Sequence, residues 1–165
     1  MLNEVIRLCK NDFSGINKES IQMDRCSYKI TNNLDTYLLD NCVLTGSRGM
    51  GLGTEYSDYD FAMTEEQFDE IVKLGYIGNT ILNYTINSGS GNKLYNKKSL
   101  KFHKDDKEYN FIIYEDESYL DLIYEITKAV SSISVSKDKS NRYYIFETLC
   151  KTIFEDIKSK NKLII

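Results

Sequence analysis

The spacing of apolar residues along the chain predicts helices and strands that form one mixed structure. Apolar residues three or four positions apart are typical of one face of a helix, and two-residue alternation is typical of a strand. Helices are predicted on this basis over residues 2–10, 34–41 and 118–131, with one more beginning at 64–67 and a last one near 138. Strands are predicted over residues 42–45, 58–61, 81–86, 94–103 and 108–114. The pattern therefore predicts an α+β (α/β) fold in which helices cover a small mixed β-sheet.

Residues 44–61 read LTGSRGMGLGTEYSDYDF and combine a buried strand, a glycine-rich turn that opens a short helix, and a second strand with two carboxylates. A helix that starts after Gly46 and Ser47 offers unpaired N–H groups and the positive end of its dipole to an anion. Asp58 and Asp60 would project from the same face of their strand, with roots roughly 6–7 Å apart. Two carboxylates so placed can share a divalent cation such as Mg²⁺. A phosphate site beside metal carboxylates predicts phosphoryl or nucleotidyl transfer.

Two other interpretations of the glycines are excluded by the residues around them. A P-loop requires Lys followed by Ser or Thr after its last glycine, whereas Gly51 is followed by Leu52 and Gly53. A dinucleotide-binding fingerprint requires a full helix after its glycines. A third alternative stays open: the glycines form a flexible loop, and the aspartates only cap or solvate the edge of a strand.

The arrangement Gly46-Ser47, ten intervening residues, then Asp58-Tyr59-Asp60-Phe61 resembles the signature of the DNA polymerase β-like nucleotidyltransferase superfamily. The longer GSRGMG…SDYDFAM looks like the small, single-domain members of that superfamily. The resemblance implies the polymerase β-like fold, with an NTP held at Gly46 and Ser47 and Mg²⁺ or Mn²⁺ held by Asp58 and Asp60. It also implies transfer of NMP to a hydroxyl of an acceptor that the sequence does not identify, which could be a protein, an RNA end or a small molecule.

Members of this superfamily use a third carboxylate from a neighbouring strand, and the matching position in the predicted strand 108–114 is Asn110. Asparagine offers one neutral oxygen, which can orient a metal or a water but binds a hard cation more weakly than a carboxylate does. Glu108 lies on the same face of that strand and could substitute. Two hypotheses follow. The chain is either an active nucleotidyltransferase with Asp58, Asp60 and Asn110 in its catalytic site, or an inactive nucleotide-binding or protein-interaction module of the same fold.

Basic residues are predicted to neutralise the nucleotide. Arg48 adjoins the Gly-Ser turn, and the apolar stripe of the last helix, continued backward from Phe146, reaches Arg142 and then Lys139. Cations in the first turns of a helix are disfavoured by its dipole, and burying them unpaired is costly. We therefore expect an anion opposite Lys139 and Arg142. It could be a nucleotide phosphate or a nearby carboxylate, unless these side chains simply extend into solvent.

The length of the chain limits the number of domains, and its net charge limits the binding partners that we expect. The 165 residues fit one domain over 1–165, and the net charge of −4 gives no general attraction to nucleic acid or to anionic membranes. A lysine run could still contact nucleic acid, although the solvated face of a hairpin is the favoured interpretation. The run comprises Lys93, Lys97, Lys98, Lys101 and Lys104.

The remaining composition bears on where the protein works. No apolar run approaches the roughly 20 residues of a membrane span, and no signal peptide is visible, so we expect a cytoplasmic protein. The absence of proline and the abundance of Lys, Asn, Ile and Tyr are compatible with AT-rich coding, as in a bacteriophage or a low-GC bacterium. In a phage, the site of action would be the host cytoplasm.

Overall fold

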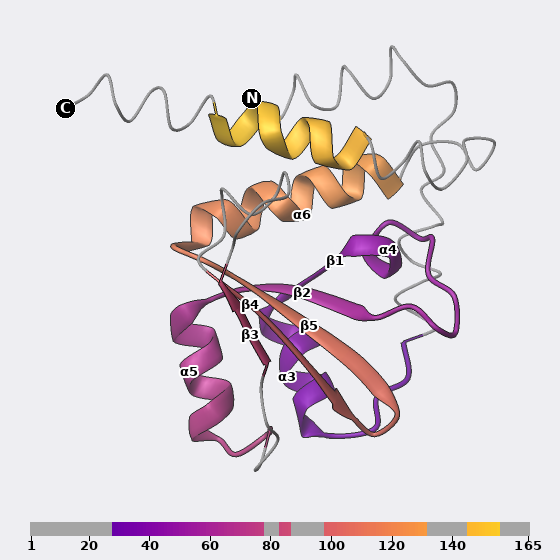
Figure 1. The fold of residues 1–165 in the computed structure, drawn as a ribbon, viewed down its shortest axis with the longest axis vertical. Helices are drawn as coiled ribbons and strands as arrows, with labels where there is room; N and C mark the ends of the chain where they lie inside the picture. Colours follow the sequence, from indigo (N-terminus) through magenta and orange to yellow (C-terminus); the bar gives the residue numbers. More distant parts are fainter. Residues whose placement is uncertain (1–27, 78–82, 87–97, 132–144, 156–165) are drawn as a thin grey trace.

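A computed structural model describes residues 28–77, 83–86, 98–131 and 145–155 of the chain (Figure 1). Its five-stranded sheet has the order β1-β2-β5-β4-β3. The strands are β1 (Val43–Thr45), β2 (Tyr59–Thr64), β3 (Asn83–Ile86), β4 (Lys98–Lys104) and β5 (Lys107–Tyr114). β2 and β5 are parallel and every other neighbouring pair is antiparallel. The predicted mixed sheet is therefore confirmed.

The helices that accompany the sheet are α3 (Asn33–Asn41), α4 (Gly46–Gly49), α5 (Glu65–Lys73) and α6 (Glu117–Ser131), together with a helix over residues 145–155. Side-chain caps begin two of them, α3 and α5. The Thr64 hydroxyl accepts the N–H of Gln67, and the Gln67 side chain accepts the N–H of Thr64. This capping box satisfies two otherwise unpaired groups and confirms the helix start predicted at 64–67.

Two-residue alternation in β2 and β5 divides the core into two layers. Phe61 and Phe111 lie on one face of the sheet, and this face packs against α3 and α5. Ala62, Ile112 and Tyr114 lie on the other face, in a core shared with α6 and the helix over 145–155. Figure 1 shows these last two helices, orange and yellow, stacked on one side of the sheet. A sheet covered on both faces explains the nearly continuous apolar runs in its central strands.

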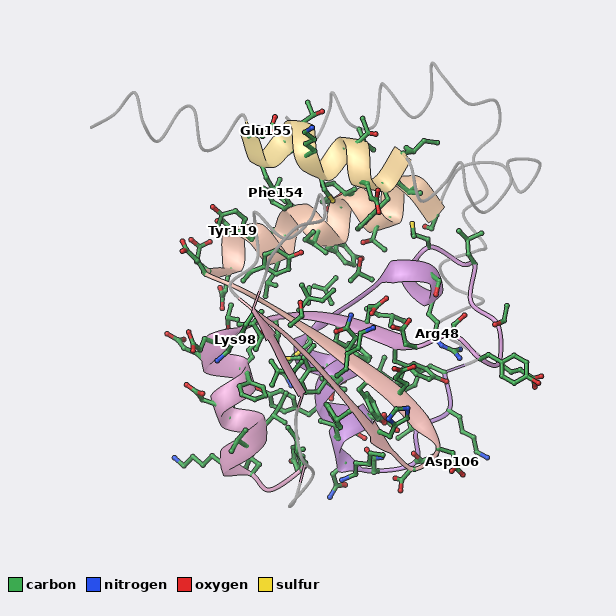
Figure 2. All side chains as sticks on the ribbon, viewed as in Figure 1. Arg48, Lys98, Asp106, Tyr119, Phe154 and Glu155 are labelled. Atoms are coloured by element: carbon green, nitrogen blue, oxygen red, sulfur yellow. The ribbon has the colours of Figure 1, made fainter. Side chains whose placement is uncertain are left out.

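Between α6 and the helix over 145–155, aromatic side chains meet. The rings of Tyr119 and Phe154 have centroids 5.4 Å apart, and Figure 2 shows Phe154 directed toward α6. The apolar stripe predicted for the last helix is confirmed for Phe146, Leu149 and Ile153, which are all buried. Its predicted continuation to Lys139 and Arg142 lies outside the described residues, as does the helix predicted over 2–10.

A buried ionic network joins α3 to the start of β5. The carboxylate of Asp35 is fully buried and accepts hydrogen bonds from Lys107 Nζ at 2.6 Å, Tyr109 Oη at 2.5 Å, Tyr28 Oη at 2.8 Å and the Thr31 N–H at 2.9 Å. Burial alone would raise the pKa of Asp35, but the hydrogen bond from Lys107, followed by the other three, lowers it below its usual value. The charge is thus compensated by specific contacts rather than by water.

Candidate functional site

One register across the sheet is occupied by polar residues. Thr45 of β1 is paired with Asp60 of β2, Asp60 with Asn110 of β5, and Asn110 with Lys101 of β4. Residues directly opposite each other on neighbouring strands share a face of the sheet. Ala62, two positions beyond Asp60, packs in the core beneath α6, so the polar row lies on the α6 face. The four strands therefore bring together two residues expected from the sequence, Asp60 and Asn110, and two that were not.

Gly46 lies directly against the Asp60 carboxylate. Its φ of +66° belongs to the left-handed region that favours glycine, and a Cβ at this position would come within 1.9 Å of Asp60 Oδ2. Neither the backbone conformation nor the space would accept a larger residue. The Gly-Ser turn and the first residues of β2 are thus in contact in the fold. Asp58 was expected on this strand, but β2 begins at Tyr59 and Asp58 lies just before it.

At Gly49 and Gly51 of the turn, too, the structure disfavours a larger residue. A Cβ at Gly49 would lie 2.5 Å from the Leu44 carbonyl oxygen and 2.9 Å from Thr127 Cγ2 of α6. Gly51 has a φ of +76°. Ser47 is buried, and its carbonyl oxygen accepts the Leu52 N–H at 2.8 Å. These contacts favour a tightly packed turn over the flexible loop that was the alternative interpretation.

Arg48 holds the segment that connects this turn to β2. Its guanidinium donates to the Ser57 carbonyl from Nε at 3.1 Å and to the Thr54 carbonyl from Nη2 at 2.8 Å. The guanidinium carbon lies 3.8 Å from the centre of the Tyr59 ring. Figure 2 shows Arg48 at this end of the sheet. Arg48 therefore has a structural role just before Asp58, and its contact with a phosphate stays a prediction.

The Asp60 carboxylate is partly buried beside like charge. The amide Nδ2 of Asn110 donates to Asp60 Oδ1 at 2.8 Å. Burial and, after it, the negative charge of Asp58 raise the pKa of Asp60, whereas Asn110 and Lys101 lower it, and together they bring this pKa to about 7. A cation would stabilise the ionised form of the Asp60 carboxylate beside Asp58.

Asn110 supplies a second indication of a cation site. Its Oδ1 is buried and has no hydrogen-bond partner among the residues that the structure describes. Leaving a buried acceptor unpaired costs about 1–3 kcal/mol, so such atoms usually have a partner. Carboxylate and amide oxygens are ligands that Mg²⁺ and Mn²⁺ accept, and Asp58, Asp60 and Asn110 therefore fit a divalent cation.

The protein supplies few charged ligands at this point. Within the described ranges, no three His, Cys, Asp or Glu side chains are grouped so that they could hold a metal ion. Glu108, which was expected as a possible substitute for the third carboxylate, does not complete such a group with Asp58 and Asp60. It is paired across the hairpin with His103.

Thr45 and Lys101 were missed because their places in the polar row depend on strand pairing. The Thr45 hydroxyl lies 2.8 Å from that of Thr127, which itself donates to the Ile123 carbonyl at 2.6 Å. This contact fixes the end of β1 to α6 beside Asp60. Lys101 was expected only as one member of a lysine run, and nothing in that run distinguishes it before the register is known.

No protein-family model matches the chain, and no curated protein matches it at a significant level. Among solved structures, the chain is similar to two of the Cid1 poly(U) polymerase, one of them in complex with the UTP analogue UMPNPP. The first has a TM-score of 0.35 and 14% identity, and the match covers 78% of this chain and 40% of that one. The second has a TM-score of 0.34 and 14% identity, with coverage of 78% and 38%. The chain spans about two-fifths of the length of these structures, and similarity at this level carries no weight beside the site residues.

In the part of the chain that the structure describes, no helix has both the length and the apolar character that crossing a membrane requires.

Proposed function

We propose that the protein is a metal-dependent nucleotidyltransferase, related to the DNA polymerase β-like superfamily, that transfers NMP from an NTP to an acceptor hydroxyl. One observation carries the proposal: Gly46 contacts the carboxylate of Asp60. A phosphate bound at the Gly46-Ser47 turn would lie next to the carboxylates that hold the cation. The sequence motif alone required only that these residues exist at a certain spacing, whereas the contact supports a common site.

In the proposed reaction the acceptor oxygen forms a bond to the α-phosphorus of the NTP. The bond from that phosphorus to the oxygen bridging to the β-phosphate breaks, and pyrophosphate leaves with the electron pair. The hydroxyl proton passes to water. Mg²⁺ or Mn²⁺, when bound, neutralises charge on the phosphate oxygens.

In this scheme the residues of the chain bind the cation and the phosphates and orient them for the reaction. Asp58 and Asp60 hold the cation, and the free Oδ1 of Asn110 orients the cation or its water on the side of the attacking hydroxyl. Gly46 and Ser47 bind the terminal phosphates. Additional positive charge is assigned to Arg48, Lys139 and Arg142, of which the last two lie outside the described residues.

The NTP is the one partner that the proposal fixes. Its base and the identity of the acceptor stay open between a protein, an RNA end and a small molecule, because the same core serves all three. Nucleic acid is not favoured as a general partner, since the chain is acidic overall and two lysines of the run are engaged. Lys98 pairs with Glu65 at 3.1 Å, and Lys104 donates to the Tyr76 carbonyl at 2.5 Å.

The test is metal-dependent NTP binding and transfer by the Asp58→Ala, Asp60→Ala double variant. Calorimetry with each NTP and Mg²⁺ should show binding to the parent and none to the variant, because the triphosphate charge is no longer compensated. Label transfer from NTPs in a cell extract should disappear with it. Asp69→Ala, which removes an exposed aspartate on α5, serves as the control and should behave as the parent. Equal binding by the double variant and the parent would overturn the site.

A second candidate is an inactive nucleotide-binding or protein-interaction module of the same fold. The residue that favours it is Asn110, because the resemblance to the superfamily matches this position to the third carboxylate. This candidate predicts NTP binding without transfer by the parent, with transfer gained in Asn110→Asp.

A further inference from the structure

Lys101 differs from the other lysines of its hairpin in where it lies. Lys98 and Lys104 share the face of β4 that carries Leu100 and Phe102 and packs toward α5, and Figure 2 shows Lys98 beside that helix. Lys107 is buried against Asp35. Lys101 lies on the opposite face, is exposed, and forms no direct ion pair with the residues that the structure describes.

The partner of Lys101 across the hairpin is Asn110, and beyond Asn110 lies Asp60. Directly opposite residues have Cβ atoms about 4.5–5.5 Å apart, so the ammonium on its flexible stem can reach the space in front of Asn110. The position where a third carboxylate would stand thus holds a neutral amide with a cation next to it.

This arrangement changes the charge that the site can compensate. Three carboxylates would give a formal charge of −3, whereas Asp58 and Asp60 with Lys101 give −2 + 1 = −1. The N–H of Asn110 also occupies one lone-pair direction of Asp60 Oδ1, on the side toward β5. Both features favour one divalent cation and oppose a second beside Asn110, since a neutral amide oxygen binds a hard cation more weakly than a carboxylate does.

We propose that this site binds one divalent cation rather than two, and that the Lys101 ammonium supplies the second positive charge, beside Asn110. The inference rests on the proposed nucleotidyl transfer, because the charge that Lys101 compensates is that of the NTP phosphates. Lys101 is then a nucleotide-binding residue on a strand that the Gly-Ser and Asp-x-Asp motif does not include.

The test counts cations with a readout that needs no turnover. The full chain is saturated with Mn²⁺ and the α,β-methylene analogue of whichever NTP binds most tightly, and bound Mn²⁺ is measured by equilibrium dialysis and electron paramagnetic resonance. The parent should hold one magnetically isolated Mn²⁺ per chain. Asn110→Asp should hold two, which are spin-coupled because paired ions lie about 3.5–4 Å apart. Circular dichroism verifies that each variant is folded.

Variants of Lys101 test its part separately. Lys101→Gln should weaken binding of the Mn²⁺ and analogue complex about tenfold, as expected for a lost charge-assisted contact. Lys101→Arg, which keeps the charge, should restore most of that affinity. Lys98→Gln is the matched control from the other face of the same strand and should bind as the parent does.

The outcomes separate this inference from the proposed function. Two Mn²⁺ per parent chain, one Mn²⁺ in Asn110→Asp, or unchanged affinity in Lys101→Gln would each overturn the inference while leaving nucleotide binding intact. Binding of none of the four analogues would overturn the proposed function, and the inference with it.

Discussion

Asn110 and Asp60 face each other on the two parallel strands of the sheet, with the amide nitrogen 2.8 Å from a carboxylate oxygen. An aspartate at position 110 would place like charge against a carboxylate whose pKa is already raised to about 7 by burial and by Asp58. The asparagine relieves that repulsion without a metal. It thereby stabilises the site in the absence of a cation, at the cost of a charged ligand when a cation is present.

Substitutions of Asn110 should distinguish the active enzyme from the inactive module. In an active enzyme, Asn110→Asp should preserve or raise transfer by adding a charged oxygen ligand. Asn110→Ala should lower turnover more than it lowers NTP affinity, because this position serves the side of the attacking hydroxyl. The measurements are pyrophosphate release with a cognate acceptor and NTP affinity by calorimetry. Full turnover in Asn110→Ala would remove Asn110 from the mechanism.

The contact between Gly46 and Asp60 predicts that replacing Gly46 impairs NTP binding. Gly46→Ala should abolish metal-dependent NTP binding. The added Cβ would come within 1.9 Å of Asp60 Oδ2 and would therefore displace the Asp60 carboxylate. The left-handed backbone alone costs an alanine about 1–2 kcal/mol. Gly75→Ala is the matched control, since Gly75 has a φ of +74° but no atom within 4 Å of its added Cβ.

Thermal unfolding and NTP calorimetry on both glycine variants separate strain from displacement. Gly75→Ala should lose a little stability and no affinity. If Gly46→Ala also retained the affinity of the parent, the Gly-Ser turn would have no part in binding.

Local signals in the sequence were sufficient for most of the helices and strands that the structure describes and for a hypothesis about part of the site. The capping box of Thr64 and Gln67 involves neighbours in the chain, so its residues could be recognised directly. The motif of Gly46, Asp58 and Asp60 was recognisable because its spacing is fixed by one short connection. The contact between Gly46 and Asp60 became visible only in the fold.

The sequence did not reveal the strand register, and therefore it did not reveal that Lys101 lies opposite Asn110. Asp105 and Asp106 form the two-residue turn between β4 and β5, with φ of 52° and 63°, and this turn fixes which residues of the hairpin face each other. Aspartate tolerates this conformation less readily than the Asn-Gly or Asp-Gly pairs that signal such turns. The ion pair of Asp35 and Lys107 joins residues 72 positions apart, and no local pattern in the sequence indicates that they meet.

The phosphate contacts assigned to Arg142 and Lys139 stay predictions, and binding measurements can test them. If Arg142 contacts the triphosphate, Arg142→Ala should weaken NTP binding by about 1.5–3 kcal/mol, the range for hydrogen bonds to charged groups. The melting temperature should change little. A large fall in melting temperature with unaltered NTP affinity would instead identify Arg142 as the structural partner of a carboxylate.

The buried ion pair of Asp35 and Lys107 predicts a stability that depends on both partners. Asp35→Asn should lower the free energy of unfolding by about 3–5 kcal/mol, because it leaves the Lys107 ammonium buried without its counter-charge. Adding Lys107→Met should recover part of this loss, since the uncompensated charge is then removed. Urea unfolding of the two single variants and the double variant measures the coupling. Asp40→Asn, an exposed position on α3, is the control.

The same pair predicts how stability responds to acid. The pKa of Asp35 is lower in the folded protein than its ordinary value of 3.8, so the unfolded chain binds the proton more readily. The contribution of Asp35 to stability is therefore fully present above pH 3.8 or so and is lost as the pH falls through the lowered folded value. The free energy of unfolding, measured by urea at decreasing pH, should fall less steeply in Asp35→Asn than in the parent. Parallel acid profiles for the parent and Asp35→Asn would show that the Asp35 carboxylate is not held in its charged form by Lys107.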